Sequence, residues 1–398
     1  MSDHRQPDPA TLCARTSDAP ASSTTPLAPP LQLSSVYRVA SLSSIDALYG
    51  GDESGSIYAR DGHPNAAQLA AKLAGLEKAE AGLVCSSGMA AESAILLASL
   101  EQGDEVALSD GIYGKTVALV GRELARFGIS HRLFDPTRPE TLREVFTPRT
   151  KLVFAETLSN PLVRLADIAG LAEVTHASGS DAKLVIDHTF APLLCYPLQL
   201  GADALTHSLT KLIGGHSDIT LGFLAGTRGV IERAGAVASA FGLTGNPFES
   251  WLALRGVSTL AVRSARACAS ALALADRLES HPSIKAVHYP GLASHPDHSR
   301  ASSLLQGGFG TIVTIDLGTR EAAESLIKRL SHIPFAPSLG DVSTTLSHPA
   351  TTSHRGQSPE QWARQGITPG LIRLSVGLED VEDLWQDFDQ ALGALHAS

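Results

Sequence analysis

The sequence predicts an α/β protein with a mainly parallel sheet between helices, followed by a smaller α+β domain. The first observation is that short apolar runs alternate with helical segments from about residue 60 to residue 226, as in βαβ units. The second is a change of pattern after about residue 250, where one long helical stretch precedes mixed segments. The third is length, because 398 residues, 43% of them hydrophobic, can bury a large core and form two domains.

The first part of the chain divides into alternating helices and strands. Residues 65–80 predict a helix, because Leu69, Leu73 and Leu76 recur at helical spacing. The next predicted segments are a strand-like run at 81–87, a helix at 88–100, a strand at 104–110, a helix at 116–128, a strand at 151–157, a helix at 165–179, and strands at 182–188, 202–208 and 221–226. Ligands bind beyond the carboxyl ends of parallel strands, so the residues that follow these strands are the candidates for a site.

The two remaining parts of the chain, residues 1–57 and the residues after 250, differ in sequence pattern. Residues 250–281 predict one long helix, and the segments that complete the smaller domain are 285–292, 310–318 (strand-like), 320–331 (helical) and 370–380. Residues 1–57 are expected to form an N-terminal arm that is rich in Pro, Ser, Thr and Ala up to about residue 35. About the first 20 residues are expected to be disordered, and an arm lying on a neighbouring subunit is the alternative.

Composition excludes several classes of partner. The net charge is -10 and no long basic run occurs, so nucleic acid and anionic membranes are not expected partners. No apolar run is long enough to span a bilayer, and the N-terminus lacks the apolar segment of a secretory signal. The four cysteines make neither a C-x-x-C pair nor a zinc-binding spacing. Reduced thiols in a cytoplasmic protein are therefore expected, and no metal is expected.

Two strand ends carry residues that can bind a charged ligand. Ser86, Ser87 and Gly88 lie between a strand and a helix, where free backbone N–H groups, a hydroxyl and a glycine that allows close approach can bind an anion. An ordinary serine N-cap is the alternative. Asp187 ends an apolar strand, and a buried carboxylate requires a partner. That partner is either a turn or helix cap, or the cationic nitrogen of a heteroaromatic ring.

The stretch THSLTKLIGGHSD, residues 206–218, supplies a third group. An apolar, glycine-rich surrounding can lower the pKa of Lys211 and make it a nucleophilic amine. Ser208 and Thr210 are suited to donate hydrogen bonds to a phosphate. A phosphate site, an acid for the ring nitrogen and a Schiff-base amine are the three requirements of pyridoxal 5'-phosphate. The sequence therefore predicts that cofactor.

Two competing chemistries lack their companion motifs. Ser208 and Lys211 match the Ser-x-x-Lys pattern of penicillin-interacting acylases, but neither Ser-Asp-Asn nor Lys-Thr-Gly occurs. No G-x-G-x-x-G follows a strand, which argues against a nicotinamide enzyme. A scaffold of the same fold without catalysis remains an alternative.

The motifs as a set resemble the Cys/Met-metabolism family of pyridoxal-phosphate enzymes, which contains cystathionine γ-synthases, cystathionine lyases, methionine γ-lyases and homoserine sulfhydrylases. The resemblance covers residues 25–395 and is carried, in family order, by IYARDGHPN, SSGMAA, YGKT, AETLSNP, IDHTFAP, HSLTKLIGGHSD, PGLASHP, SLGDVSTTLSHPATTSH and LIRLSVGLED. It implies a fold-type-I transferase with a cofactor-binding domain at 58–250 and an α+β domain at 251–398. It also implies a homo-oligomer, a dimer with shared sites or a tetramer.

The resemblance implies the residues that hold the cofactor. Lys211 would bond the cofactor aldehyde, and Asp187 would pair with the ring nitrogen. The residues expected to hold the phosphate are Ser87, Gly88, Met89, Ser208 and Thr210. Tyr58 and Arg60 would reach the phosphate of a neighbouring subunit, and their i, i+2 spacing places both on one face of an extended segment.

The resemblance also implies residues that act on the substrate. Tyr113 would stack on the cofactor ring and assist proton transfer, as a catalytic residue beside Lys211. Asn160 would bond the ring hydroxyl and the substrate carboxylate. Arg373 would bind the substrate α-carboxylate in a bidentate pair. Ser338 would help to position the substrate or the lysine.

Three positions depart from the family pattern. His188 stands where the family usually has Asn, Lys115 where many members have Gly or Cys, and Ser343 where Glu or a basic residue is common. The last two are expected near the substrate's distal group. The resemblance implies an enzyme that eliminates at a carbon–sulfur bond of a small amino acid, giving a 2-keto acid, ammonia and a thiol. Replacement at the γ-carbon, as in a synthase or sulfhydrylase, is the alternative.

Overall fold

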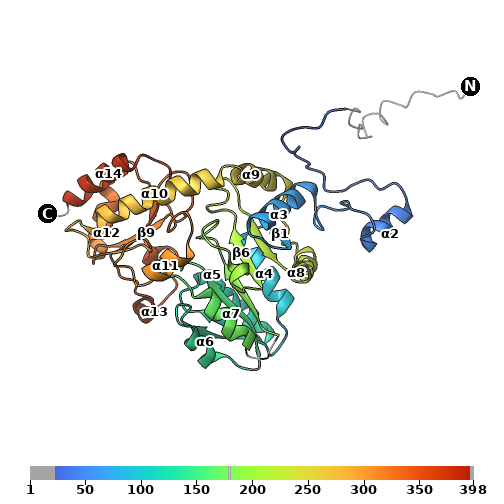
Figure 1. Ribbon diagram of the computed structural model, residues 1–398, viewed down its shortest axis with the longest axis horizontal. Helices are drawn as coiled ribbons and strands as arrows, with labels where there is room; N and C mark the ends of the chain where they lie inside the picture. Colours follow the sequence, from blue (N-terminus) through green and yellow to red (C-terminus); the bar gives the residue numbers. More distant parts are fainter. Residues whose placement is uncertain (1–22, 178, 180, 395–398) are drawn as a thin grey trace, which may run out of the picture.

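The computed structural model describes residues 23–177, 179 and 181–394, and shows two β-sheets, one of seven strands and one of four. The long helix α10 (Leu260–Glu279) lies in the upper left of the folded body in Figure 1 and links the parts that hold these sheets. The predicted disorder of about residues 1–20 lies outside the described residues.

The seven-stranded sheet is the frame of the molecule. Its strands are β1 (Ala81–Cys85), β2 (Glu105–Ser109), β3 (Ser130–Phe134), β4 (Thr150–Glu156), β5 (Lys183–Asp187), β6 (Ala204–Ser208) and β7 (Gly222–Gly226). The spatial order is β1-β7-β6-β5-β4-β2-β3, and β7 runs antiparallel to both of its neighbours while the other pairs are parallel. The prediction of a mainly parallel sheet is confirmed. The carboxyl ends of β4, β5 and β6 meet at one edge.

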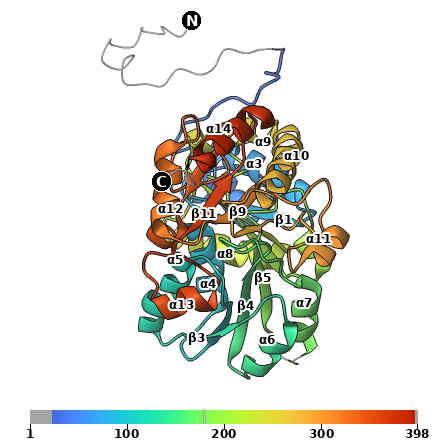
Figure 2. The same ribbon diagram turned by 90° about the vertical axis from the view of Figure 1, so that its left-hand side faces the viewer.

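Helices cover both faces of this sheet. They are α3 (Pro64–Leu76), α4 (Gly88–Ser99), α5 (Gly114–Ala118), α6 (Pro139–Val145), α7 (Ile168–Ala177), α8 (Arg228–Phe241) and α9 (Pro247–Val257). Alternate residues of β4 face opposite cores: Phe154 packs with α4 and α8, whereas Val153 and Ala155 pack with α6 and α7. Figure 2 shows α6 and α7 beside β4 and β5. The near-continuous apolar sequence of these strands follows from burial on both faces.

The four-stranded sheet forms the core of the C-terminal part. Its strands are β8 (Ala286–His288), β9 (Ile312–Asp316), β10 (Thr345–Ser347) and β11 (Leu371–Ser375), in the antiparallel order β10-β11-β9-β8. The accompanying helices are α10 (Leu260–Glu279), α11 (His298–Leu304), α12 (Arg320–Arg329), α13 (Pro359–Arg364) and α14 (Val381–Gly393). Leu274 and Leu278 of α10 pack against this sheet in a core that also contains Phe388. This is the smaller α+β part that the sequence predicts.

Two predicted helices differ from the observed ones. The helix predicted at 250–281 is two helices, α9 and α10, because the carbonyl oxygen of Gly256 accepts hydrogen bonds from the Arg263 guanidinium (2.9 Å) and the Thr259 hydroxyl (3.2 Å) where a continuing helix would use its own backbone. The helix predicted at 116–128 begins at Gly114 and continues as a π-helical turn and a 3₁₀ turn before ending at Gly128. The domain boundary predicted after residue 250 falls within α9 and stays a prediction.

The N-terminal arm carries a short helix, α2 (Leu42–Gly50), that has no buried residue. Figure 1 shows this helix standing away from the rest of the chain. Several apolar side chains of the arm are exposed, among them Leu33, Val36 and Leu42. None of the described helices is both long and apolar enough to cross a bilayer.

Candidate active site

A cavity of about 630 Å³ lies at the carboxyl ends of the central strands. The chain brings eleven of the predicted site residues to its wall: Ser87, Gly88, Met89, Tyr113, Asn160, Asp187, Ser208, Thr210, Lys211, Ser338 and Arg373. They come from both sheets and from seven separate stretches of sequence, so the cavity is where the predicted constellation meets.

The start of α4 forms one wall of the cavity. The Ser87 hydroxyl accepts a hydrogen bond from the backbone N–H of Ala90 (3.0 Å) and begins the helix. Gly88 lies so close to Ser208 that an added Cβ would be 3.0 Å from the Ser208 Cβ. The first N–H groups of a helix have no partner within the helix and favour an anion. The wall therefore has the properties of a phosphate site.

Asp187 ends β5 and is linked to that wall through Thr189. The Asp187 Oδ1 atom accepts a hydrogen bond from the Thr189 N–H (2.8 Å), and the Thr189 hydroxyl accepts one from the Ser208 N–H (2.8 Å). Burial raises the pKa of Asp187, and its hydrogen bonds with Thr189 oppose that rise. A cationic group placed against this carboxyl would favour its ionised form.

Lys211 follows β6 and reaches toward the other sheet. Its Nζ atom donates a hydrogen bond to the Ser338 Oγ atom (3.0 Å). Burial, and then the positive charge of Arg373, lower the pKa of the amine. Both effects favour the neutral, nucleophilic form of an amine.

Arg373 of β11 supplies a buried cation beside this amine. Its Nη1 atom donates to Asn160 Oδ1 (3.0 Å), and its Nη2 atom donates to the backbone oxygen of Ser338 (2.9 Å). Its Nε atom is buried and has no acceptor among the described residues. Burial lowers the pKa of Arg373 to about 10. A guanidinium with an unused donor in a cavity wall can bind a carboxylate.

Sequence reasoning missed two buried carboxyls in the same wall. Glu92 of α4 is 4% exposed and accepts a hydrogen bond from the Thr116 hydroxyl (2.7 Å). Burial, and then the charge of Asp187, raise the pKa of Glu92 to about 8. Glu156 ends β4, its Oε1 atom accepts the N–H of Tyr113 (2.8 Å), and burial raises its pKa well above the ordinary value. The strand-end rule could have found Glu156, whereas Glu92 lies in an apolar helix with no such signal.

His188, the first departure from the family pattern, is fully buried. Its Nδ1 atom lies 2.7 Å from the Thr157 hydroxyl, and its Nε2 atom lies 3.1 Å from the backbone oxygen of Cys195. Burial lowers its pKa to about 4, so the ring is neutral near pH 7. The neighbouring His207 is bonded to Glu77 (2.9 Å). His188 therefore joins two loops beneath the sheet and does not line the cavity.

Four other predicted positions do not line the cavity of this chain. Tyr58 and Arg60 directly follow the arm, and the Arg60 guanidinium is 5.4 Å from the centre of the Tyr58 ring. Lys115 and Ser343 are exposed. The expectation that these two lie at the distal group of a substrate finds no support in the single chain. The outer part of the wall is instead formed by Thr351, Thr352, Ser353 and Arg355.

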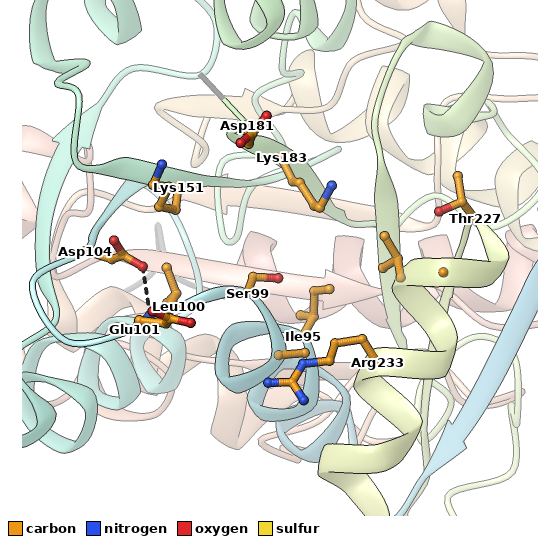
Figure 3. Close-up of a pocket in the computed structure, with 13 residues that line it drawn as sticks. Ile95, Ser99, Leu100, Glu101, Asp104, Lys151, Asp181, Lys183, Thr227 and Arg233 are labelled. Atoms are coloured by element: carbon orange, nitrogen blue, oxygen red, sulfur yellow. Dashed lines mark hydrogen bonds between the residues drawn. The ribbon is translucent and has the colours of Figure 1, made fainter. Parts of the chain in front are cut away.

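A second cavity, of about 590 Å³, lies at the opposite end of the sheet. Lys151 and Lys183 come from the starts of β4 and β5, and Arg233 comes from α8, as Figure 3 shows. Asp104 and Glu101 oppose these cations in the same wall. None of the predicted site residues lies here, and the charges are mixed.

The first cavity fits pyridoxal 5'-phosphate. An amine with a lowered pKa, an acid at a strand end and a helix start closed by Gly88 lie in one wall. The Thr206 hydroxyl and the Glu156 Oε2 atom are buried in that wall without partners among the described residues. Such orphaned polar atoms are expected where a polar ligand belongs.

Comparison with known proteins agrees with this site. The fold and the cavity define a pyridoxal-phosphate enzyme of fold type I. Residues 10–393 match the model of the Cys/Met metabolism PLP-dependent enzyme family, and the chain belongs to that family. It is 37% identical over 372 residues to the L-methionine gamma-lyase of Treponema denticola, covering 93% of each chain. It is 40% identical over 362 residues to the O-succinylhomoserine sulfhydrylase of Pseudomonas aeruginosa, covering 90% of this chain and 89% of the relative.

A solved structure carries the cofactor itself. The O-acetylhomoserine (thiol)-lyase structure from Campylobacter jejuni, described as containing N'-pyridoxyl-lysine-5'-monophosphate, has a TM-score of 0.87 and 30% sequence identity. The match covers 92% of this chain and 95% of that chain. The protein is thus a pyridoxal-phosphate-dependent enzyme of sulfur amino-acid metabolism.

Proposed function

We propose that the protein eliminates the sulfur-bearing group from a small amino acid and releases a 2-keto acid, ammonia and a thiol. The observation that carries the proposal is that the Lys211 amine, the Asp187 carboxyl and the Arg373 guanidinium lie in the wall of one cavity. The likeness to the methionine gamma-lyase supports elimination. Replacement at the γ-carbon is the second candidate, favoured by the 40% identity to the sulfhydrylase.

The cavity residues have separate proposed roles. Pyridoxal phosphate bonded to Lys211 supplies an electron sink for negative charge that forms at the substrate Cα. Asp187 keeps the ring nitrogen protonated, because an anion beside it favours the cationic form. Arg373 and Asn160 bind the α-carboxylate and thereby orient the Cα–H bond.

Proton transfers are assigned to two groups near the reacting carbons. The Lys211 amine would remove the Cα proton of a bound substrate, and its lowered pKa suits a general base. Ser338 holds that amine in place through their hydrogen bond. Tyr113 covers the ring and assists transfer, and its backbone N–H is fixed by Glu156.

The active unit is proposed to be a homo-oligomer with shared sites. Tyr58 and Arg60 do not line the cavity of their own chain, and they directly follow an arm that has several exposed apolar side chains. We propose that both residues complete the phosphate site of a neighbouring subunit, in a dimer or tetramer. We also propose the cytoplasm as the location of the protein.

A substrate panel tests the function. Purified protein should be yellow, and borohydride should bleach it while fixing the label on Lys211. Keto acid and thiol release should then be measured with cystathionine, methionine, homocysteine and cysteine, beside O-acetyl- and O-succinylhomoserine with sulfide. Colourless protein that does not bind the cofactor would contradict the proposal and favour a scaffold.

A further inference from the structure

A third, smaller cavity lies next to the active-site cavity, and the two share lining residues. This outer cavity has a volume of about 400 Å³, and its wall is formed by Arg320, His348, Ala350, Thr351, Arg355, Trp362 and Pro369. Thr351 and Arg355 line both cavities. The two cavities therefore adjoin each other at these two residues.

The walls of the two cavities differ in their charged residues. The wall of the active-site cavity contains three carboxyls, those of Glu92, Glu156 and Asp187, together with the cations Lys211, Arg373 and Arg355. The outer cavity has the cations Arg320 and Arg355 in its wall and, among the described residues, no Asp or Glu. An anionic group is therefore favoured at the outer end.

Arg355 has no competing partner within the described chain. No Asp or Glu in residues 23–394 that the structure describes lies within ion-pair distance of its guanidinium. By contrast, Arg164 is paired with Asp297 at 2.6 Å. A guanidinium presents a planar fork of donors that matches a carboxylate, so Arg355 remains available for a ligand.

The backbone that carries Arg355 is held by several hydrogen bonds. The His348 carbonyl oxygen accepts from the N–H groups of Thr351 and Thr352 (both 3.1 Å). The Trp362 indole N–H donates to the His354 carbonyl oxygen (2.9 Å). An added Cβ at Gly114 would lie 3.3 Å from the backbone oxygen of Ser353, so the loop also touches the start of α5. The backbone at Arg355 is thus held in place before a ligand binds, while its side chain is exposed.

We propose that Arg355 binds a second carboxylate, at the distal end of the substrate, and so makes the enzyme prefer substrates that carry one. This inference rests on the proposed function, in which Arg373 binds the α-carboxylate at the inner end. Thioethers and esters whose distal chain ends in a carboxylate belong to this class. Amino acids with an uncharged distal group, such as methionine, do not.

Two matched pairs of substrates test the inference. Cystathionine is compared with methionine for elimination, and O-succinylhomoserine with O-acetylhomoserine, each with sulfide, for replacement. In Arg355→Gln, kcat/KM for the carboxylate-bearing member should fall about tenfold or more, since a charged hydrogen bond is lost. The neutral member should change by no more than about twofold, and Arg355→Lys should be intermediate.

A neighbouring arginine provides the matched control. Arg364 in α13 is exposed and lines neither cavity. Arg364→Gln should therefore leave kcat/KM unchanged for both members of each substrate pair. An equal loss for both members of a pair, or no loss, would overturn the role of Arg355. Loss of oligomer in Arg355→Gln, measured by light scattering, would assign the guanidinium to a subunit contact instead.

A binding measurement separates this inference from the proposed function. The melting temperature of the holoenzyme is measured with succinate, adipate or suberate and with butyrate or hexanoate. At least one dicarboxylate should stabilise wild type and Arg364→Gln more than the monocarboxylates do, and this difference should disappear in Arg355→Gln. Unchanged dicarboxylate binding in Arg355→Gln would contradict the inference. Wild-type holoenzyme that turns over no member of either pair would contradict the proposed function alone.

Discussion

The Lys211 Nζ atom donates a hydrogen bond of 3.0 Å to the Ser338 Oγ atom. The amine follows a strand of the seven-stranded sheet, whereas the hydroxyl lies in the segment that leads to β10 of the other sheet. The contact therefore joins the two halves of the molecule at the proposed reaction centre.

Replacing these two residues should have different effects. Lys211→Ala should lower turnover by several orders of magnitude, because it removes both the amine that bonds the cofactor and the proposed base. Ser338→Ala should retain the borohydride-fixed label and lower kcat by about tenfold, because one positioning hydrogen bond is lost. Single-turnover kinetics and mass mapping of the label measure both effects. Loss of the label in Ser338→Ala would contradict a positioning role.

Arg373→Lys should weaken binding of the substrate carboxylate. A lysine keeps the charge but not the fork of donors that contacts Asn160 and the Ser338 carbonyl. KM should rise about tenfold or more while the cofactor content stays unchanged. A visible spectrum of the purified variant checks the cofactor, and a variant with unchanged KM would show that the α-carboxylate binds elsewhere.

Glu92 should make the stability of the cofactor-free protein depend on pH. Its pKa is about 8 in the folded protein and has an ordinary value of 4.5, so the folded state keeps a proton that the unfolded state loses. The free energy of unfolding should therefore fall as pH rises through this window. Glu92→Gln should flatten that slope, which urea unfolding at several pH values measures. If the slope is unchanged in Glu92→Gln, the pH dependence of the free energy of unfolding comes from Glu156 or Asp187 instead.

Gly222→Ala should displace the start of α4, which forms the proposed phosphate site. An added Cβ at Gly222 would lie 1.9 Å from the backbone oxygen of Ser87, so the start of α4 must shift. A loss of about 1–3 kcal/mol in the free energy of unfolding and weaker cofactor binding are expected. Gly235→Ala in α8, where nothing lies within 4 Å of the added Cβ, is the control and should keep or raise stability.

Mixing inactive variants should test the shared site. Arg60→Ala should weaken retention of the cofactor, and Lys211→Ala should be inactive. Mixed oligomers should regain part of the activity if Arg60 completes a neighbour's site, because one intact site then forms from two chains. The mixture is assayed after co-refolding, with each variant refolded alone as its control. Absence of any recovery would argue for sites built from single chains.

The sequence predicted best those site residues that directly follow an apolar strand. Asp187 and Lys211 follow apolar strands, and strand ends meet at one edge of a parallel sheet, so their approach could be expected. Glu92 could not be found in this way, because its burial beside Asp187 depends on how α4 packs. The sequence did not predict Arg355 as a site residue for a similar reason, because its loop is positioned by contacts with His348 and Trp362. The break between α9 and α10 coincides with a hydrogen bond from the Arg263 side chain to the Gly256 carbonyl oxygen, which helical periodicity does not reveal.

The division of the cavity wall between two sheets has a mechanical consequence. A substrate held by Arg373 at its carboxylate and joined to a cofactor held by Asp187 and Ser208 would act as a temporary link between the halves of the molecule. Separation of the two sheets would then require release of the substrate, which adds its binding free energy to the resistance of the folded state. Each turnover would thus link the two halves of the molecule when substrate binds and release them when product leaves.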